Sequence, residues 1–335
     1  MTNRQQPTPL KSSDNFFRLK PLVAGVRIVI ASGFLAGSVT PAFAELPVPV
    51  AGGGWVTSGT ASQLINGNTL QINQHSDKAI LNWQSFNVGK ENTVNFVQPS
   101  ASSVALNRIQ QQDPSKILGQ ITANGQVYLY NQNGFIFGKD SVVNANTLLA
   151  STLKITDDAF NRGITRVFDE DGGAALAIEP MKAGDAMDPK TASILIEAGA
   201  KIHTDKAGRI VIAAPKIVNK GSLTSDEQGQ IILAASEDKV YLQAADSKSP
   251  FAGLVVEVDR GGKVTNSGDV LAKQGNVTMA GFAVNQQGRI TATTSVNVNG
   301  SIRLLAQEQH GKLGEQLIAT STNRSVAAED GLGKE

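Results

Sequence analysis

The chain has 335 residues, of which 30 are basic, 29 are acidic and none is cysteine, so its formal net charge at pH 7 is +1. The lack of cysteine excludes disulfide scaffolds, thiol catalysis and cysteine metal sites, and the lack of a basic excess argues against nucleic acid as a partner. The 33 glycines and the low aromatic content of 5% favour short strands joined by tight turns.

Residues 1–44 have the pattern of a secretory signal peptide. Three basic residues precede an uncharged, largely apolar run at 28–39, and the small-x-small sequence Ala42-Phe43-Ala44 follows. We expect cleavage between Ala44 and Glu45, because the run is shorter than the roughly 20 residues that span a bilayer. The segment holds five basic residues and one acidic residue, so the remaining 25 basic and 28 acidic residues have a net charge of −3. The expected route is through the Sec translocon, signal peptidase and the periplasm to the outside or the surface of the cell.

The segment from Leu46 to Val97 is strand-like but less regular than the chain that follows it. Its aliphatic and aromatic residues are separated by Asn-Gly and Asp/Lys turns. A stack of repeats needs a cap at its end, and we expect this segment, which is richer in aromatic residues, to supply the N-terminal cap.

The stretch from Trp83 to Thr152 carries seven short blocks in a defined order. They are residues 83–89 (WQSFNVG), 93–99 (TVNFVQP), 103–109 (SVALNRI), 114–119 (PSKILG), 123–129 (ANGQVYL), 131–138 (NQNGFIFG) and 143–152 (VNANTLLAST). Their order and spacing resemble the N-terminal haemagglutination-activity domain, or TPS domain, of two-partner secretion exoproteins of the filamentous haemagglutinin type. The resemblance implies an all-β, right-handed parallel β-helix with an N-terminal cap over residues 45–307. It also implies export by an outer-membrane β-barrel transporter of the TpsB type, which has periplasmic POTRA domains.

The best-known turn of this family, Asn-Pro-Asn-Gly-Ile, is matched at Asn131, Asn133 and Gly134 but not at Gln132 or Phe135. Asn-Gly supplies the positive φ angles of a tight turn whichever residue precedes it, so we expect the turn to form without the proline. These residues have two interpretations, a turn that closes one repeat and a contact with the transporter, and both can hold.

Asn107 and Arg108 are further candidates for contact with the transporter. Their position between aliphatic residues of one strand also allows a structural interpretation, with Arg108 as a solvated outward residue or a member of an ion pair in the cap. A companion Asn-Pro-Asn-Leu turn of the family has no literal copy here, and the nearest proline turn is at residues 112–115.

The strand pattern lapses at residues 161–192, which we interpret as an insertion into the repeats. An acidic cluster lies just before and within this segment, and its members are Asp157, Asp158, Asp169, Glu170 and Asp171. Carboxylates gathered on one face of a β-helix would suit a polysaccharide-degrading enzyme, whereas a charge run in an irregular segment is usually a solvated loop. The segment lacks the ligands of an EF-hand, and His75, His203 and His310 are scattered, so no catalytic, cofactor or metal site is expected.

A repeat follows the insertion. Gly-x-aliphatic-x-aliphatic recurs at Gly208, Gly229, Gly275 and Gly300, with spacings of 21, 46 and 25 residues. We interpret 46 as two repeats, which gives a period of about 20 to 25 residues, typical of a solenoid. The Leu-x-x-Leu-x-Leu pattern of leucine-rich repeats is missing, so the repeat independently predicts a β-helix.

Residues 308–335 lose the strand pattern, and we expect a polar tail, either the natural end or a point within a longer protein. Three functions remain open. The leading one is an adhesin that binds host or matrix glycans; the others are a carrier of a haemolysin or contact-dependent inhibition toxin, and a polysaccharide-degrading enzyme.

Overall fold

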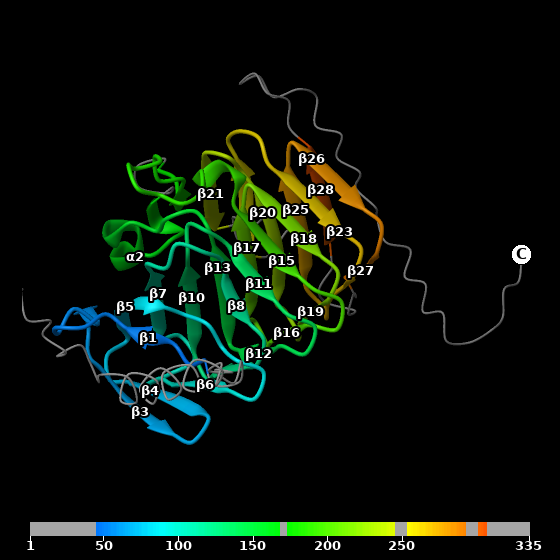
Figure 1. Ribbon diagram of the computed structural model, residues 1–335. Helices are drawn as coiled ribbons and strands as arrows, with labels where there is room; N and C mark the ends of the chain where they lie inside the picture. Colours follow the sequence, from blue (N-terminus) through cyan, green and yellow to red (C-terminus); the bar gives the residue numbers. More distant parts are fainter. Residues whose placement is uncertain (1–44, 168–172, 245–252, 293–300, 307–335) are drawn as a thin grey trace, which may run out of the picture. The chain divides into compact units, whose positions relative to one another are not determined.

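The computed structural model describes residues 45–167, 173–244, 253–292 and 301–306 (Figure 1). The expected signal peptide, including Ala44, and the expected tail lie outside the described residues, as do three members of the acidic cluster, Asp169, Glu170 and Asp171. In the part of the chain that the structure describes, no helix has the length and apolar character needed to cross a membrane.

The described chain winds into a stack of successive turns, each called a coil here, and three sheets form the wall of this stack. Sheet A has the order β1 (Val48–Pro49), β5 (Lys78–Ser85), β7 (Val104–Ile109), β10 (Gln126–Tyr130), β13 (Thr147–Ser151), β17 (Arg209–Ala214), β20 (Gln230–Ala235), β25 (Asn276–Gly281) and β28 (Ser301–Ala306), and β2 (Val56–Ser58) also pairs with β5. Sheet B has the order β3 (Ala61–Asn66), β4 (Thr69–Gln74), β6 (Thr93–Val97), β9 (Gln120–Ala123), β12 (Val142–Ala145), β16 (Lys201–Thr204), β19 (Ser222–Ser225), β24 (Asp269–Ala272) and β27 (Arg289–Ala292). Sheet C has the order β8 (Ser115–Ile117), β11 (Phe135–Phe137), β15 (Ser193–Ile196), β18 (Lys216–Asn219), β23 (Lys263–Asn266) and β26 (Ala283–Gln286).

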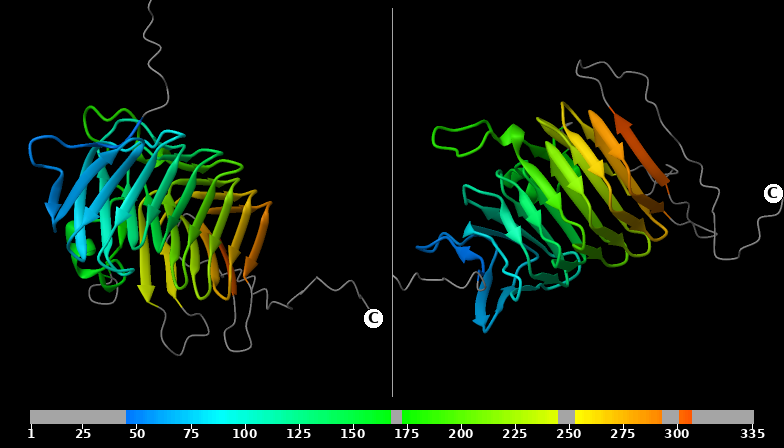
Figure 2. Two further views of the ribbon diagram at one scale, coloured as in Figure 1. Left: turned by 90° about the horizontal axis from the view of Figure 1, so that it is seen from below. Right: turned by 45° about the vertical axis from the view of Figure 1, so that its right-hand side comes forward.

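From β7 onward, the chain visits the sheets in the repeating order A, C, B, and strands of neighbouring coils pair in parallel within each sheet. Figure 2 shows the strands of successive coils stacked side by side. The strand order therefore confirms the predicted parallel β-helix, and connections between parallel strands of one sheet are right-handed almost without exception.

Alternate residues of all three sheets fill the interior of the coil. In β17, Ile210 and Ile212 belong to this interior core, while Val211 faces outward into a second apolar cluster on the outside of sheet A. Val211 is only 1% exposed, because two segments that leave the coil cover this outer face. Sheet A is thus buried on both faces, which explains its nearly continuous apolar strands, such as β20 with the sequence QIILAA.

Antiparallel strands cap the N-terminal end of the coil. β3 forms a hairpin with β4, and β1 and β2 pair antiparallel with β5. Trp55 packs edge-on against Trp83, with 5.8 Å between the ring centroids. Glu45, which follows the expected cleavage point, accepts a hydrogen bond of 2.6 Å from Asn87 Nδ2 and so fastens the start of the described chain to the first coil. The cap is smaller than predicted, because β4 and β5 already belong to the parallel ladders.

Two excursions leave the coil, and both do so between sheets A and C. The first runs from 152 to 192 and holds α2 (Asp157–Arg162), β14 (Leu176–Ala177) and the 3-10 turn η1 (Pro189–Thr191), so it begins before the predicted boundary at 161. The second lies between β20 and β23 and holds the hairpin of β21 (Lys239–Ala244) and β22 (Leu254–Val258). β14 pairs with β21 and joins the two excursions into one small sheet on the outside of sheet A.

The second excursion corrects the interpretation of the repeat. β20 and β25 are direct neighbours in sheet A, so the 46 residues between Gly229 and Gly275 form one coil enlarged by a hairpin rather than two coils. The hairpin strands have the same alternating apolar pattern as the coil strands. The spacing of the glycines alone therefore could not distinguish an inserted hairpin from an additional coil.

The two-sided burial of sheet A can be tested with two neighbouring residues of β20. Ile232 faces the excursions and Leu233 faces the interior, and both are fully buried. We expect Ile232→Ala and Leu233→Ala each to lower the free energy of unfolding by about 2–5 kcal/mol, as measured by urea denaturation. Leu64→Ala, at a residue of β3 that is 59% exposed, is the control and should change it by less than about 0.5 kcal/mol. An Ile232→Ala variant as stable as the control would show that the excursions do not cover sheet A.

Candidate functional site around the Asn131 turn and the first excursion

The Asn131 turn, residues 131–134, connects β10 of sheet A to β11 of sheet C. The Gly134 N–H donates to the Asn131 carbonyl at 3.0 Å, and the Asn133 N–H donates to Asn131 Oδ1 at 2.9 Å. Gly134 has a φ of 110°, and a Cβ at this position would lie 2.3 Å from the carbonyl oxygen of Ser193 in the next coil. Asn133 does not have a positive φ, so Gly134 is the only residue of the expected Asn-Gly pair with the positive φ angle. Glycine is required at this position both by its φ and by the close approach of the next coil.

Buried amides tie this turn to the coils before it. Asn131 Nδ2 donates to the Asp113 carbonyl at 3.1 Å and to Ser115 Oγ at 3.0 Å, and Asn133 Nδ2 donates to the Gln111 carbonyl at 2.7 Å. The side chain of Gln111 continues the series to the preceding coil, where its Oε1 accepts from the Phe86 N–H at 2.8 Å. The amides therefore satisfy the backbone groups that a change of direction leaves unpaired at this corner.

Asn107 lies inside the coil. In sheet A it is in register with Leu81 and Leu129, and it is fully buried. Its Oδ1 accepts a hydrogen bond of 2.9 Å from Trp83 Nε1, and its Nδ2 donates to the carbonyl of Tyr128 at 3.2 Å.

The folded domain thus buries most of the candidate residues for recognition by the transporter. Asn107, Asn131 and Phe135 are fully buried, and Asn133 is 2% exposed. These side chains can contact a partner only in a chain that has not yet folded. Gln132, where the family motif has proline, faces the first excursion instead, and its Nε2 donates to Asp185 Oδ1 at 3.3 Å.

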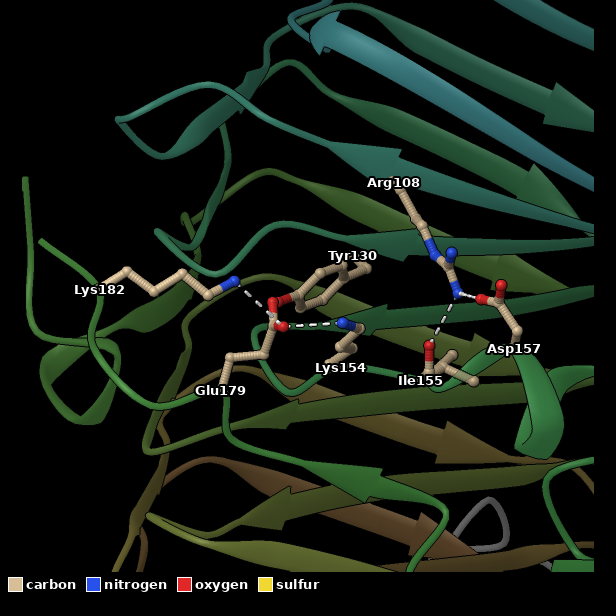
Figure 3. Close-up of polar contacts among 7 residues, drawn as sticks. All are labelled: Arg108, Tyr130, Lys154, Ile155, Asp157, Glu179 and Lys182. Atoms are coloured by element: carbon tan, nitrogen blue, oxygen red, sulfur yellow. Dashed lines mark hydrogen bonds and ion pairs between the residues drawn. The ribbon is translucent and has the colours of Figure 1, made fainter. Parts of the chain in front are cut away.

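Arg108 points to the outer face of sheet A and fastens the start of the first excursion. Its Nη2 donates to the Ile155 carbonyl at 3.1 Å and forms an ion pair with Asp157 (Figure 3). The side chain of Arg108 is 19% exposed and that of Asp157 is 66% exposed, so the ion pair lies at the surface. Arg108 thus faces outward, but its ion pair is with the first excursion rather than within the cap.

Glu179 fastens the middle of the same excursion. Its Oε2 accepts a hydrogen bond of 2.8 Å from the Tyr130 hydroxyl, and its Oε1 pairs with Lys154 at 2.7 Å and with Lys182 at 3.5 Å (Figure 3). Partial burial acts to raise the pKa of Glu179, but the hydrogen bonds from Lys154 and Tyr130 outweigh it and hold the pKa below its usual value. Burial and the neighbouring carboxylate raise the pKa of Tyr130 well above its usual value, so this hydroxyl remains a donor.

Sequence reasoning missed the group formed by Tyr130, Lys154 and Glu179. Tyr130 and Glu179 are 49 residues apart, and no local pattern joins a strand residue to a residue of an irregular insertion at that distance. The available signal was the tyrosine next to Asn131, since a buried tyrosine usually has a partner for its hydroxyl.

The two described members of the acidic cluster and the two described histidines have polar partners within the fold. Asp157 pairs with Arg108, and Asp158 pairs with Arg162 of the same helix at 3.1 Å. His75 contacts Ser62, His203 contacts Asp226, and His310 lies outside the described residues. Among the described residues, no three side chains of His, Asp or Glu gather in a way that could hold a metal ion.

Comparison with known proteins supplies a family. The model of the TPS secretion domain matches residues 51–324. A heme/hemopexin-binding protein of Haemophilus influenzae is 26% identical over 264 residues, which are 76% of this chain and 27% of the relative. A second heme/hemopexin-binding protein from that species is 45% identical over 83 residues, which are 25% of this chain and 9% of the relative. The crystal structure of the HMW1 secretion domain from Haemophilus influenzae is 27% identical, with a TM-score of 0.62 over 74% of this chain and 60% of that one.

The Glu179 contacts predict a pH-dependent attachment of the first excursion. A folded-state pKa below the ordinary value of 4.5 stabilises the fold above that value, and the stabilisation is lost as pH falls through the folded pKa. The protection factors of the amides in residues 152–167 and 173–192, which correct for the slower intrinsic exchange in acid, should therefore fall as the pH is lowered. Glu179→Gln should weaken protection there at neutral pH by about 1–2 kcal/mol and flatten the pH dependence.

The control for this experiment is Glu227→Gln, which removes a carboxylate from an exposed pair with Lys206, the two side chains being 53% and 65% exposed. It should leave exchange in the excursion unchanged. Equal exchange in Glu179→Gln and the parent protein would contradict the assigned role of Glu179.

Proposed function

Because the chain belongs to the TPS secretion domain family, the domain of secreted two-partner exoproteins, we propose that it directs its own passage through a cognate outer-membrane transporter. The match over residues 51–324 carries this proposal. The transporter would be a TpsB-type β-barrel whose periplasmic POTRA domains bind the arriving chain. Residues 1–44 would act before this step, with export by the Sec translocon and cleavage by signal peptidase between Ala44 and Glu45.

The burial of the motif residues supports recognition before folding. Asn107, Asn131, Asn133, Gly134 and Phe135 lie inside the coil or its corner, where a transporter domain cannot reach them. An extended chain in the periplasm exposes all five. We therefore propose that the transporter reads this stretch while it is unfolded, and that the same residues then close the first coils outside the cell.

The order of the coils supports folding in one direction. The N-terminal end is closed by the antiparallel cap, whereas β26, β27 and β28 each pair with a single neighbour among the described strands. Fixing the backbone of some 22 residues costs at least about 22 kcal/mol, so a coil needs a finished neighbour whose hydrogen-bonding groups and apolar layer it can use. A chain that emerges with its N-terminal part leading would find that template in the capped end.

The export proposal predicts the location of the protein after loss of its transporter. Deletion of the cognate transporter gene should leave the chain in the periplasm or degraded there, and expression of the transporter from a plasmid should restore secretion. Fractionation and immunoblotting measure the outcome, with a periplasmic protein as the marker of lysis. Unchanged secretion without any such transporter would reject the proposal.

What the exported protein finally binds is a separate proposal. The chain spans 27% of the length of the first relative, so the activity of a whole exoprotein does not follow from this domain. We propose adhesion to host or matrix glycans as the leading role, since the repeats offer an extended surface. The names of two relatives favour binding of heme or hemopexin as the second candidate.

A haemolysin or inhibition toxin would need a further effector segment, and a polysaccharide-degrading role is disfavoured because the family is a secretion domain rather than an enzyme family.

The two leading roles differ in what the secreted protein retains. If adhesion is correct, the purified protein on a solid support should retain cells or glycans and should not retain heme-loaded hemopexin above a bovine serum albumin control. If the protein retains hemopexin but retains neither cells nor glycans, the assigned role becomes binding of heme or hemopexin. Surface plasmon resonance with both ligands on the same preparation makes the comparison direct.

A further inference from the structure

The three outer faces of the coil differ in chemistry. The outer face of sheet A is apolar and lies beneath the excursions. The outer face of sheet B is mainly polar, and ion pairs join neighbouring coils at the ends of its strands, as in Lys273–Asp226 at 2.7 Å and Arg289–Asp269 at 3.3 Å. The outer face of sheet C follows neither pattern.

An aliphatic strip runs along the middle of the sheet C face. Ile136, Leu195 and Val218 are in register on three successive strands, and each is partly exposed. The apolar cluster that the excursions form with sheet A includes no residue of sheet C, so these excursions do not bury the strip. A row of in-register aliphatic side chains on an uncovered face is the kind of surface that a partner covers.

Exposed lysines flank the strip. Lys116, Lys216 and Lys263 lie on β8, β18 and β23, and within the described parts of the chain none of them forms an ion pair. The acidic residue closest to this face in sequence, Glu197, follows β15 and uses its Oε2 to accept from the backbone N–H of Lys139 at 3.1 Å. The three ammonium groups thus have no carboxylate partner among the described residues, although the chain beyond residue 44 has a net charge of −3.

Two of the lysines repel each other. Lys216 and Lys263 are direct register partners on adjacent parallel strands, which lie about 4.8 Å apart. Like charges placed opposite each other across two strands destabilise a sheet. A negative group bound between the two ammonium groups would turn this repulsion into two favourable contacts.

We propose that the outer face of sheet C is a docking surface for an acidic, partly apolar segment of a partner protein. Carboxylates of the segment bind Lys216 and Lys263, and its aliphatic side chains cover the strip of Ile136, Leu195 and Val218. A polyanionic glycan would leave the strip uncovered, and the strip holds none of the Trp or Tyr residues that mark a membrane interface. The surface belongs to the folded domain, so it is independent of the recognition of the unfolded chain during export.

The test uses the secreted protein and a synthetic strand-length peptide of alternating Glu and Leu, with binding measured by fluorescence anisotropy. The double variant Lys216→Gln/Lys263→Gln should weaken binding about tenfold, which corresponds to the loss of two exposed charge contacts. The matched control Lys90→Gln/Lys206→Gln removes the same charge from exposed lysines elsewhere and should bind within about twofold of the parent protein. Equal binding by both double variants would overturn the proposal.

A single charge reversal separates docking from folding. Lys263→Glu replaces the repulsive pair with an attractive one, so its melting temperature should rise while its affinity for the peptide falls. A fall in both would attribute the binding loss to misfolding and would contradict the assigned repulsion. Secretion of each variant is measured in parallel, because normal secretion with lost binding separates this surface from the export role.

Two further ligands distinguish the class of partner. Phosphatidylglycerol vesicles and heparin oligosaccharides are titrated against the parent protein and the same variants. Tighter binding to either one than to the peptide, with the same dependence on Lys216 and Lys263, would overturn the choice of a protein partner.

Discussion

The in-register stacking of parallel strands is the constraint on which the rest of this structure depends. Each strand of a coil finds its backbone partners in the coils before and after it, so no coil satisfies its own hydrogen bonds. Stacking also leaves little room at the corners. A Cβ on Gly275 would lie 2.0 Å from the carbonyl oxygen of Gly229, and a Cβ on Gly208 would lie 1.9 Å from that of Asn146. Three of the glycines that reveal the repeat in the sequence, Gly208, Gly229 and Gly275, lie where one coil crosses closely over another.

The sequence predicted the β-helix because its two main signals are local. Glycines at corners and alternating aliphatic residues in strands lie within a few positions of each other. The first excursion was visible as a lapse of that pattern. The second was not, because β21 and β22 alternate as the coil strands do, and their antiparallel pairing on the outside of sheet A depends on residues far away in the sequence.

The candidate site was harder to predict for the same reason. In the run Val104–Ile109, Asn107 is the polar residue that suggests an exposed position, yet it lies in the core. It is tolerated there because Trp83 Nε1, 24 residues earlier, donates to it. A buried amide with satisfied hydrogen bonds costs little, whereas an unsatisfied one is expensive. Whether Asn107 faces inward or outward is therefore decided by the register of a neighbouring coil, which no local pattern contains.

In-register stacking stabilises columns of amides and destabilises columns of equal charges, and this difference affects which side chains each outer face of the coil carries. An amide both donates and accepts, so a column of amides satisfies itself, as Asn219, Asn266 and Gln286 do with bonds of 2.7 and 2.9 Å. A column of equal charges cannot, because each coil places the next charge about 4.8 Å away. At two positions sheet B places opposite charges on neighbouring coils, Asp226 beside Lys273 and Asp269 beside Arg289. On sheet C, Lys216 and Lys263 place two like charges side by side, and an external anion bound between them would make both contacts favourable.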